Sequence, residues 1–194
     1  PMNALVEDQM TRIRRALDST DARAVMDQHF NNNRIFFGRY TSSTKVTGFH
    51  FHPRPNENGD DGKEYERRRR KLEELFNESV AMQKTQDRAN KIDEDQEEED
   101  KVRYLFPSVD GGELTSRWDI QETPPDILIT NISMLNAILA REVDAPIIER
   151  TREWITSSDN AYFFLVLDEL HLQRGSAGTE VCYLLRLLFD KLGL

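Results

Sequence analysis

The sequence of 194 residues contains only one cysteine, Cys182. A lone cysteine cannot form a disulfide within the chain, which excludes a disulfide framework and fits a reducing compartment. Cys182 lies in an apolar helical pattern, and that setting favours a packing role over a reactive thiol. We therefore do not expect cysteine chemistry to carry the function.

Long apolar runs are lacking as well. No stretch approaches the roughly 18 consecutive apolar residues that a membrane-spanning helix requires. The sequence also shows no charged and apolar leader of the kind that directs secretion. These absences predict a soluble, cytoplasmic protein without a membrane partner.

Basic residues are outnumbered by acidic ones, and the formal net charge is −9 at pH 7. Seven of the eight residues from 93 to 100 are acidic and contribute −7 of this charge, which leaves −2 for the rest of the chain. Because the rest of the chain is nearly neutral, it could form a local basic cleft, and the net charge does not exclude a nucleic-acid partner. The mean hydropathy of −0.68 indicates that part of the chain is strongly solvated.

The most informative pattern is an apolar run that leads directly into carboxylates. Five apolar residues, 163–167, precede Asp168, Glu169, Leu170 and His171. Such a run is typical of a buried strand in a parallel α/β sheet, where ligands bind at the carboxyl ends of the strands. Asp168 could hold Mg²⁺ through its water shell, while Glu169 orients and deprotonates the water that attacks a γ-phosphate. The alternative is a strand that simply ends in acidic residues before a turn.

The order of strand, polar loop and helix recurs along the chain. Strands are expected at residues 34–37, 126–130 and 163–167, and the loop after the first covers residues 38–44. Helical patterns cover residues 5–17, 133–139 and 179–192, and in the first of these Arg14 falls on the polar face. This recurrence predicts an α/β fold with a parallel sheet and right-handed helical crossovers.

Residues 49–118 do not follow this order and are interpreted as a helical, charged insertion. The pattern is helical from about residue 63 to residue 89, with an apolar stripe at Leu72, Leu75, Phe76 and Val80 beside the four arginines 67–70. The arginines could contact DNA, or the stripe could contact a protein partner. The competing interpretation is a solvated helix followed by a disordered acidic turn, which charge runs favour. Residues 1–48 and 119–194 then form the α/β domain.

Several segments together resemble superfamily 2 helicases of the DEAD/DEAH-box kind. Residues 1–9 resemble motif Ia, residues 130–135 resemble the Thr-Pro-x-x-Leu motif, and residues 168–171 match motif II. The match continues through Arg174-Gly175 and residues 178–180. The residues of these segments are similar to those of the YprA-like branch of DNA helicases. Within that branch they are similar to the DrmA-type helicases of the antiphage system DISARM.

The resemblance implies a partial first RecA-like motor domain. It also implies ATP and Mg²⁺ as cofactors of the complete protein, with Asp168, Glu169 and His171 as catalytic residues. In that family the histidine couples hydrolysis to domain movement. A glycine-rich phosphate loop of the form G-x-x-x-x-G-K-[ST] does not occur in the sequence, so this chain alone is expected to be inactive.

The resemblance further implies DNA as partner, single-stranded or with a single-stranded overhang. Contacts in such motors go mainly to phosphates through short polar side chains and backbone amides. The candidates for the DNA contact are Asn3, Arg39, Tyr40, Thr130 and Asn131. Thr130 has a competing role, because its hydroxyl could satisfy a loop amide.

The leading interpretation is part of an ATP-dependent DNA helicase or translocase in bacterial antiphage defence, with a companion defence-system protein. A YprA-like DNA-repair helicase is the first alternative. The second is a non-catalytic helicase fragment that binds nucleic acid or protein.

Overall fold

The computed structural model describes residues 2–50, 61–168 and 174–194. These residues form two compact units. The first unit comprises Pro1–Ile120 and Pro125–Ile129, and the second comprises Gln121–Pro124 and Thr130–Leu194. None of the helices in the described part of the chain combines the length and the apolarity needed to cross a bilayer.

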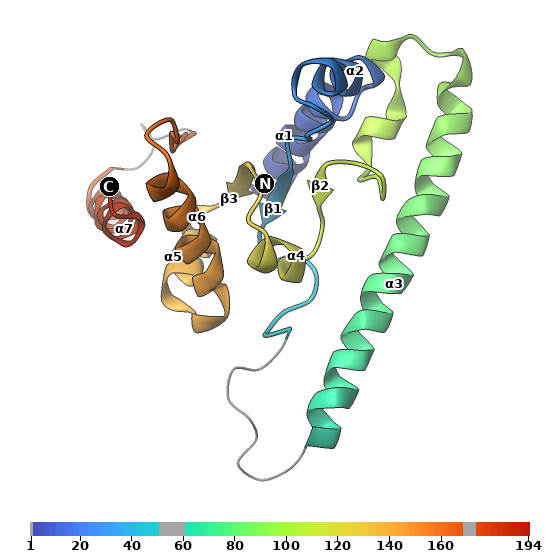
Figure 1. The fold of residues 1–194 in the computed structure, drawn as a ribbon. Coiled ribbons are helices and arrows are strands. Elements are labelled where there is room, and N and C mark those ends of the chain that lie inside the picture. The colour runs from blue at the N-terminus through green and yellow to red at the C-terminus, as the bar shows by residue number, and fades with distance from the viewer. Residues whose placement is uncertain (1, 51–60, 169–173) are drawn as a thin grey trace. The chain divides into compact units, whose positions relative to one another are not determined.

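The first unit holds the three strands and the longest helix (Figure 1). Its elements in chain order are α1 (Met2–Leu17), α2 (Thr20–His29), β1 (Phe37–Tyr40), α3 (Asp61–Ile92), the 3-10 turns η1 (Asp93–Asp95), η2 (Glu98–Asp100) and η3 (Val102–Leu105), then β2 (Glu113–Leu114), α4 (Arg117–Glu122) and β3 (Ile127–Thr130). The last residues of α4 and β3 belong to the second unit. The predicted helices at residues 5–17 and 63–89 are therefore confirmed.

The strands form a small sheet in the order β2-β1-β3. β1 runs parallel to β2, with Phe37 opposite Glu113 and Gly38 opposite Leu114. A Cβ on Gly38 would lie 2.9 Å from the Leu114 carbonyl oxygen, so the two strands approach this closely only with glycine at that position. The predicted α/β class with a parallel sheet is confirmed.

The first strand lies further along the chain than predicted. It covers residues 37–40 rather than 34–37, and it includes Gly38, where the loop was expected to begin. Arg34 instead lies before the strand, where its guanidinium pairs with Asp27 and donates to the Arg23 carbonyl oxygen. Gly38 lies within the strand because β1 and β2 approach each other closely at this position. The local sequence pattern does not reveal this contact with β2.

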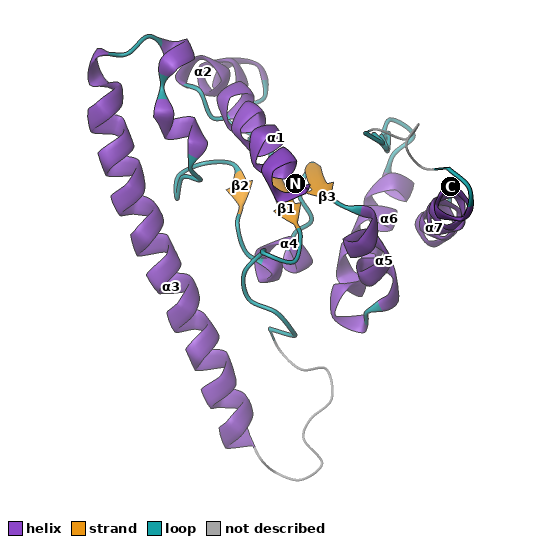
Figure 2. Cartoon of the chain, turned by 180° about the vertical axis from the view of Figure 1, so that it is seen from behind, coloured by secondary structure: helices purple, strands orange, loops and turns teal. Residues whose placement is uncertain are grey.

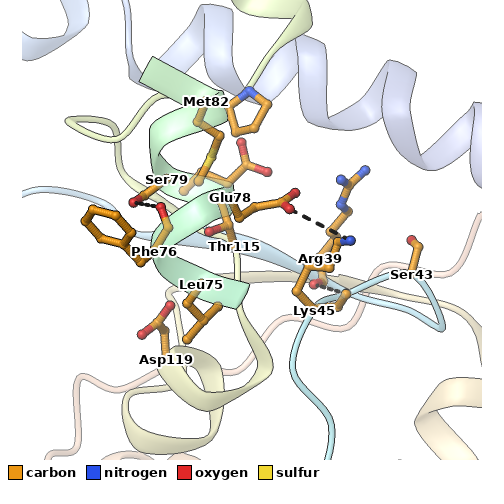
Figure 3. Close-up of a pocket in the computed structure, with 13 residues that line it drawn as sticks. Arg39, Ser43, Lys45, Leu75, Phe76, Glu78, Ser79, Met82, Thr115 and Asp119 are labelled. Carbon is orange, nitrogen blue, oxygen red and sulfur yellow. Dashed lines mark hydrogen bonds and ion pairs between the residues drawn. The ribbon is translucent and has the colours of Figure 1, made fainter. Parts of the chain in front are cut away.

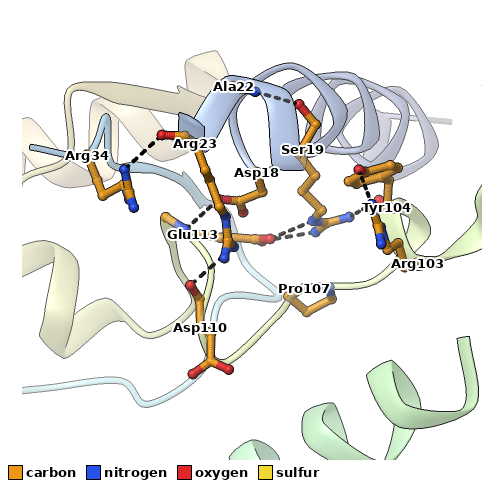
Figure 4. Close-up of polar contacts among 12 residues, drawn as sticks. Asp18, Ser19, Ala22, Arg23, Arg34, Arg103, Tyr104, Pro107, Asp110 and Glu113 are labelled. Carbon is orange, nitrogen blue, oxygen red and sulfur yellow. Dashed lines mark hydrogen bonds and ion pairs between the residues drawn. The ribbon is translucent and has the colours of Figure 1, made fainter. Parts of the chain in front are cut away.

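A buried ion pair joins α1 to the sheet (Figure 4). Arg14 Nε lies 2.6 Å from Glu113 Oε2, and Arg14 Nη2 lies 3.0 Å from Oε1 of the same carboxylate. The side chains are only 2% and 1% exposed. The placement of Arg14 on a polar, solvent-facing side of the helix is therefore wrong, because Glu113 compensates its charge inside the protein.

The helix α3 packs on the first unit through its C-terminal part, where η3 lies between α3 and α1 (Figures 1 and 2). Gln86 Nε2 donates to the carbonyl oxygens of Arg103, Phe106 and Pro107. Asp93 is buried and accepts from the backbone amides of Val102 and Arg103 at 2.8 and 3.0 Å. The prediction of a disordered acidic turn is wrong, because this carboxylate holds the backbone of the returning chain in place.

The second unit is a small helical bundle. It contains α5 (Ile132–Ala140), the turn η4 (Glu142–Asp144), α6 (Ala145–Ser157) and α7 (Ser176–Leu192). Its core consists of Leu139, Leu184, Leu188 and Leu192. The helices predicted at residues 133–139 and 179–192 are confirmed.

The strand predicted at residues 163–167 is wrong for this structure. The segment is irregular and exposes alternate side chains: Phe163 and Leu165 pack on the core of the second unit, while Phe164 is 83% and Val166 is 88% exposed. A strand needs a hydrogen-bonded neighbour, and no strand of the described sheet pairs with this segment.

Cys182 is exposed on α7, so its predicted packing role is wrong. The buried face of that helix is formed by Val181, Leu184, Leu188 and Leu192, and Cys182 lies outside it.

We expect the native thiol to react with a disulfide reagent at nearly the rate of the urea-unfolded chain, because nothing shields it. Replacing Cys182 by serine should shift the free energy of unfolding by less than about 0.5 kcal/mol, as for other surface changes. Absorbance of the released thiolate measures the first effect, and urea titration measures the second. Protection of the thiol until unfolding would contradict the exposed position.

Candidate nucleotide and nucleic-acid site

Two of the predicted site residues of the first unit, Arg39 and Tyr40, lie on β1, and the third, Asn3, lies on α1. Arg39 is partly exposed and forms an ion pair with Glu7 of α1. Tyr40 is fully buried, and the Arg117 guanidinium carbon lies 5.2 Å from its ring centroid. Tyr40 therefore supports the strand from inside the protein, and its ring does not lie on the surface.

The turn after β1 is held by side-chain and backbone hydrogen bonds. The Thr41 amide donates to Thr44 Oγ1 at 2.9 Å, and that hydroxyl donates to the Arg39 carbonyl oxygen at 2.9 Å. Arg117 also stabilises the turn, because its guanidinium donates to the carbonyl oxygens of Thr41 and Thr44 at 2.9 and 3.1 Å. No local sequence pattern singles out Arg117, because its partners lie more than 70 positions away in the chain.

A cavity of about 370 Å³ opens beside this turn (Figure 3). On one side lie β1 and the segment after it, which contribute Arg39, Ser43 and Lys45. On the other side lies α3, which contributes Leu75, Phe76 and Glu78. Lys45 Nζ lies 3.8 Å from Glu78 Oε2 across it. Both cations on the β1 side already face a carboxylate, Arg39 that of Glu7 and Lys45 that of Glu78, and Asp119 also lines the cavity.

The predicted residues of the second unit lie where β3 ends and α5 begins. Asn131 is the N-cap of α5, and its side-chain oxygen accepts from the Met134 amide at 2.8 Å. Thr130 is partly exposed and also engaged in interactions within the protein. The cap leaves the Asn131 amide group as a donor beside the positive end of the α5 dipole, where anions are stabilised.

The carboxylate of Asp168 is exposed at the end of the irregular segment. Glu169 and His171 lie outside the described residues, and so does the side chain of Asn3. In the described part of the chain, no group of three or more metal-binding side chains occurs. A single exposed carboxylate does not by itself form a metal site, so the Mg²⁺ site at Asp168 stays a prediction.

The comparisons give one relative. The chain matches no protein-family profile, and no solved structure matches it. It is 30% identical over 213 aligned positions to Druantia protein DruE of Escherichia coli (strain UMEA 4076-1). The alignment covers 100% of this chain and 12% of the relative, so the chain spans a small part of that protein's length. The name of this relative refers to Druantia and not to DISARM. The predicted similarity to DISARM-type helicases therefore stays a prediction.

Proposed function

We propose that the chain is part of a bacterial antiphage defence protein of the Druantia kind and contributes to an ATP-dependent DNA helicase or translocase motor. The observation that carries the defence role is the alignment to Druantia protein DruE along the whole chain. The same observation favours antiphage defence over the DNA-repair role of YprA-like helicases. It also favours Druantia over DISARM as the system, with a companion protein of that system as partner.

The motor function rests on the sequence motifs together with the polar groups at the strand ends. The parallel sheet carries Arg39 on β1, and Asn131 follows β3 at the start of a helix. Both positions offer donors to phosphate oxygens, which would give DNA contacts without sequence preference. Tyr40 would act indirectly, because its buried ring stacks on the arginine that holds the turn.

The chemistry would be carried by the residues after the irregular segment. Asp168 would hold the water shell of Mg²⁺, and the bound metal would neutralise charge on the phosphates. Glu169 would accept the proton of the attacking water, and His171 would couple that step to domain movement. The phosphate-binding loop that such chemistry needs would come from another part of the complete protein.

The decisive experiment is ATP hydrolysis by the full-length protein with and without single-stranded DNA. We expect hydrolysis that DNA stimulates strongly. Hydrolysis that is indifferent to DNA would contradict a nucleic-acid motor. Absence of hydrolysis under both conditions would favour a non-catalytic binding module.

Two substitutions at Asn131 separate its structural role from a DNA contact. Asn131→Ala removes the cap and should lower the free energy of unfolding by about 1 kcal/mol. It should also weaken strand binding by about 1 kcal/mol, the scale of one lost hydrogen bond, with basal hydrolysis nearly unchanged.

Asn131→Asp should keep the stability, because aspartate is an equally good N-cap, yet it should weaken DNA binding through charge repulsion. Urea titration and fluorescence anisotropy with labelled DNA measure the two quantities. Undiminished DNA affinity in the aspartate variant would remove Asn131 from the contact surface.

A further inference from the structure

The face of α3 that turns toward the first unit changes character along the helix. Near its C-terminal end this face is buried, with Gln86 and Ala89 in contact with the rest of the unit. About five turns earlier it carries Arg67 and Lys71 instead. A helix face that contacts its own protein is normally apolar, so two cations at these positions need a physical explanation.

The side chains of Arg67 and Lys71 both approach the backbone at Gly48. Gly48 has a φ of +85°, and a Cβ there would lie 3.4 Å from Lys71 Nζ and 3.6 Å from Arg67 Nη1. The Gly48 carbonyl oxygen accepts from the indole nitrogen of Trp118 at 2.9 Å. Lys71 Nζ lies 5.8 Å from the centroid of the Trp118 ring. The ring of His50 also packs against Trp118, with the two ring centroids 4.5 Å apart. The ammonium group is thus held in place by an aromatic ring.

The positive charge at this place is only partly compensated. Arg67 forms an ion pair with Glu64 and donates to the Phe49 carbonyl oxygen at 2.9 Å. In the described part of the chain, Lys71 forms no ion pair with a carboxylate. Partial burial lowers the pKa of Lys71, and the nearby charge of Arg67 lowers it further. Both causes reflect a cation that an anion would stabilise.

The next residue along the helix adds a second uncompensated charge. Arg70 is exposed and has no ion pair among residues that the structure describes. Its neighbour Arg69 differs, because its guanidinium lies 3.0 Å from Glu73 and 3.8 Å from Glu66. Among the described residues of this basic run, 67–71, Arg70 and Lys71 form no ion pair with a carboxylate, although the charges of Glu74 and Glu64 act on Lys71 from nearby and raise its pKa.

We propose that the base of α3 is a second nucleic-acid contact, at which Lys71 and Arg70 bind backbone phosphates. Arg70 and Lys71 are adjacent on the helix and line neither the cavity beside the turn after β1 nor the open one around Phe76, which suits an extended polyanion better than a single small anion. Phosphate contacts of this kind give affinity without sequence preference. The inference extends the proposed function because DNA is the same ligand, but it requires neither ATP nor the motif residues.

The test measures binding of a fluorescent single-stranded oligodeoxynucleotide to the 194-residue chain by anisotropy at several salt concentrations. Each phosphate contact on a single strand contributes about 0.7 to the slope of log K against log salt. The double variant Lys71→Gln and Arg70→Gln should therefore lower the slope by about 1.4 and weaken binding roughly tenfold or more at low salt. Arg70→Gln alone, a fully exposed change, should lower the slope by about half as much.

Arg69→Gln is the matched control, because it removes the same charge from the same run but from a guanidinium that glutamates already compensate. It should leave the slope nearly unchanged. Circular dichroism of each variant checks that the helix content is preserved.

Equal slopes for the wild type and the double variant would overturn the inference, and so would an equal loss in Arg69→Gln. Displacement of the oligonucleotide by inorganic phosphate or ATP at equal phosphate concentration would indicate a small-anion site instead. Displacement by polyglutamate at equal charge would indicate an acidic protein partner. DNA-stimulated hydrolysis by the full-length protein would stand after any of these results, so the two proposals fail separately.

Discussion

Replacing Glu113 by glutamine is expected to lower the free energy of unfolding of the first unit by about 3–5 kcal/mol. The carboxylate compensates Arg14 through two hydrogen bonds inside the protein, where water does not reach either group. Glutamine keeps the shape but leaves the guanidinium charge buried without a counterion. The other acceptors of Arg14, the carbonyl oxygens of Tyr104 and Leu105, carry no full charge.

The two tryptophans allow this effect to be measured in the correct unit. Trp118 is buried in the first unit, whereas Trp154 is 53% exposed in the second. Urea titration followed by fluorescence in a Trp154→Phe background therefore reports the first unit alone. An unfolding midpoint equal to that of the parent protein would contradict the role of the buried pair.

A matched control lies on the same helix. Asp8 forms an exposed ion pair with Arg12, at side-chain exposures of 53% and 73%. Asp8→Asn should cost less than about 1 kcal/mol, because solvent screens such pairs. Replacing Arg14 and Glu113 together by methionine and leucine should recover much of the loss, since no uncompensated charge then remains.

Replacing Glu169 by glutamine in the full-length protein is expected to preserve ATP binding and to abolish turnover. The amide keeps the shape of the side chain but cannot accept a proton from the attacking water. A positioned general base contributes about 10²–10⁴-fold to the rate, so hydrolysis should fall by at least about 100-fold. DNA-stimulated phosphate release measures the rate, and a fluorescent ATP analogue measures the affinity.

The neighbouring carboxylate provides the comparison. Asp168→Asn should weaken Mg²⁺-dependent nucleotide binding as well as turnover, because the proposed role of Asp168 is to hold the metal's water shell. Hydrolysis near the wild-type rate in Glu169→Gln would refute the assignment of the base. Loss of ATP binding in that variant would assign Glu169 to the metal instead.

Features set by local sequence could be predicted, and features set by distant partners could not. Four helices, α1, α3, α5 and α7, were predicted within a few residues, because their apolar spacing is a local property. The helices α2, α4 and α6 were not predicted. The N-cap at Asn131 had a local signal too, since asparagine directly precedes the apolar helical run. The register of β1 depends on how closely Gly38 approaches Leu114, which only the folded chain reveals.

The polar residues show the same division. Arg14 was placed in solvent because its helix pattern is amphipathic, but Glu113, which is 99 positions away, makes burial favourable. The acidic run was interpreted as solvated for the same reason, although Asp93 binds two amides about ten positions later. At the candidate site, the position of Thr130 and Asn131 at the end of β3 could be predicted from local sequence. Arg39 and Tyr40 lie within β1 rather than in the loop after it, and the clamp of Arg117 on the turn has no local signal.

The irregular segment before Asp168 has a thermodynamic consequence. Its outward side chains, Phe164 and Val166, are almost fully solvated, and burying apolar surface gains about 25 cal/mol for each Å² removed from water. An apolar surface packed over these two side chains would gain that free energy and would also restrict the backbone that carries Asp168. Burial of the segment and restriction of this carboxylate would then be a single cooperative transition.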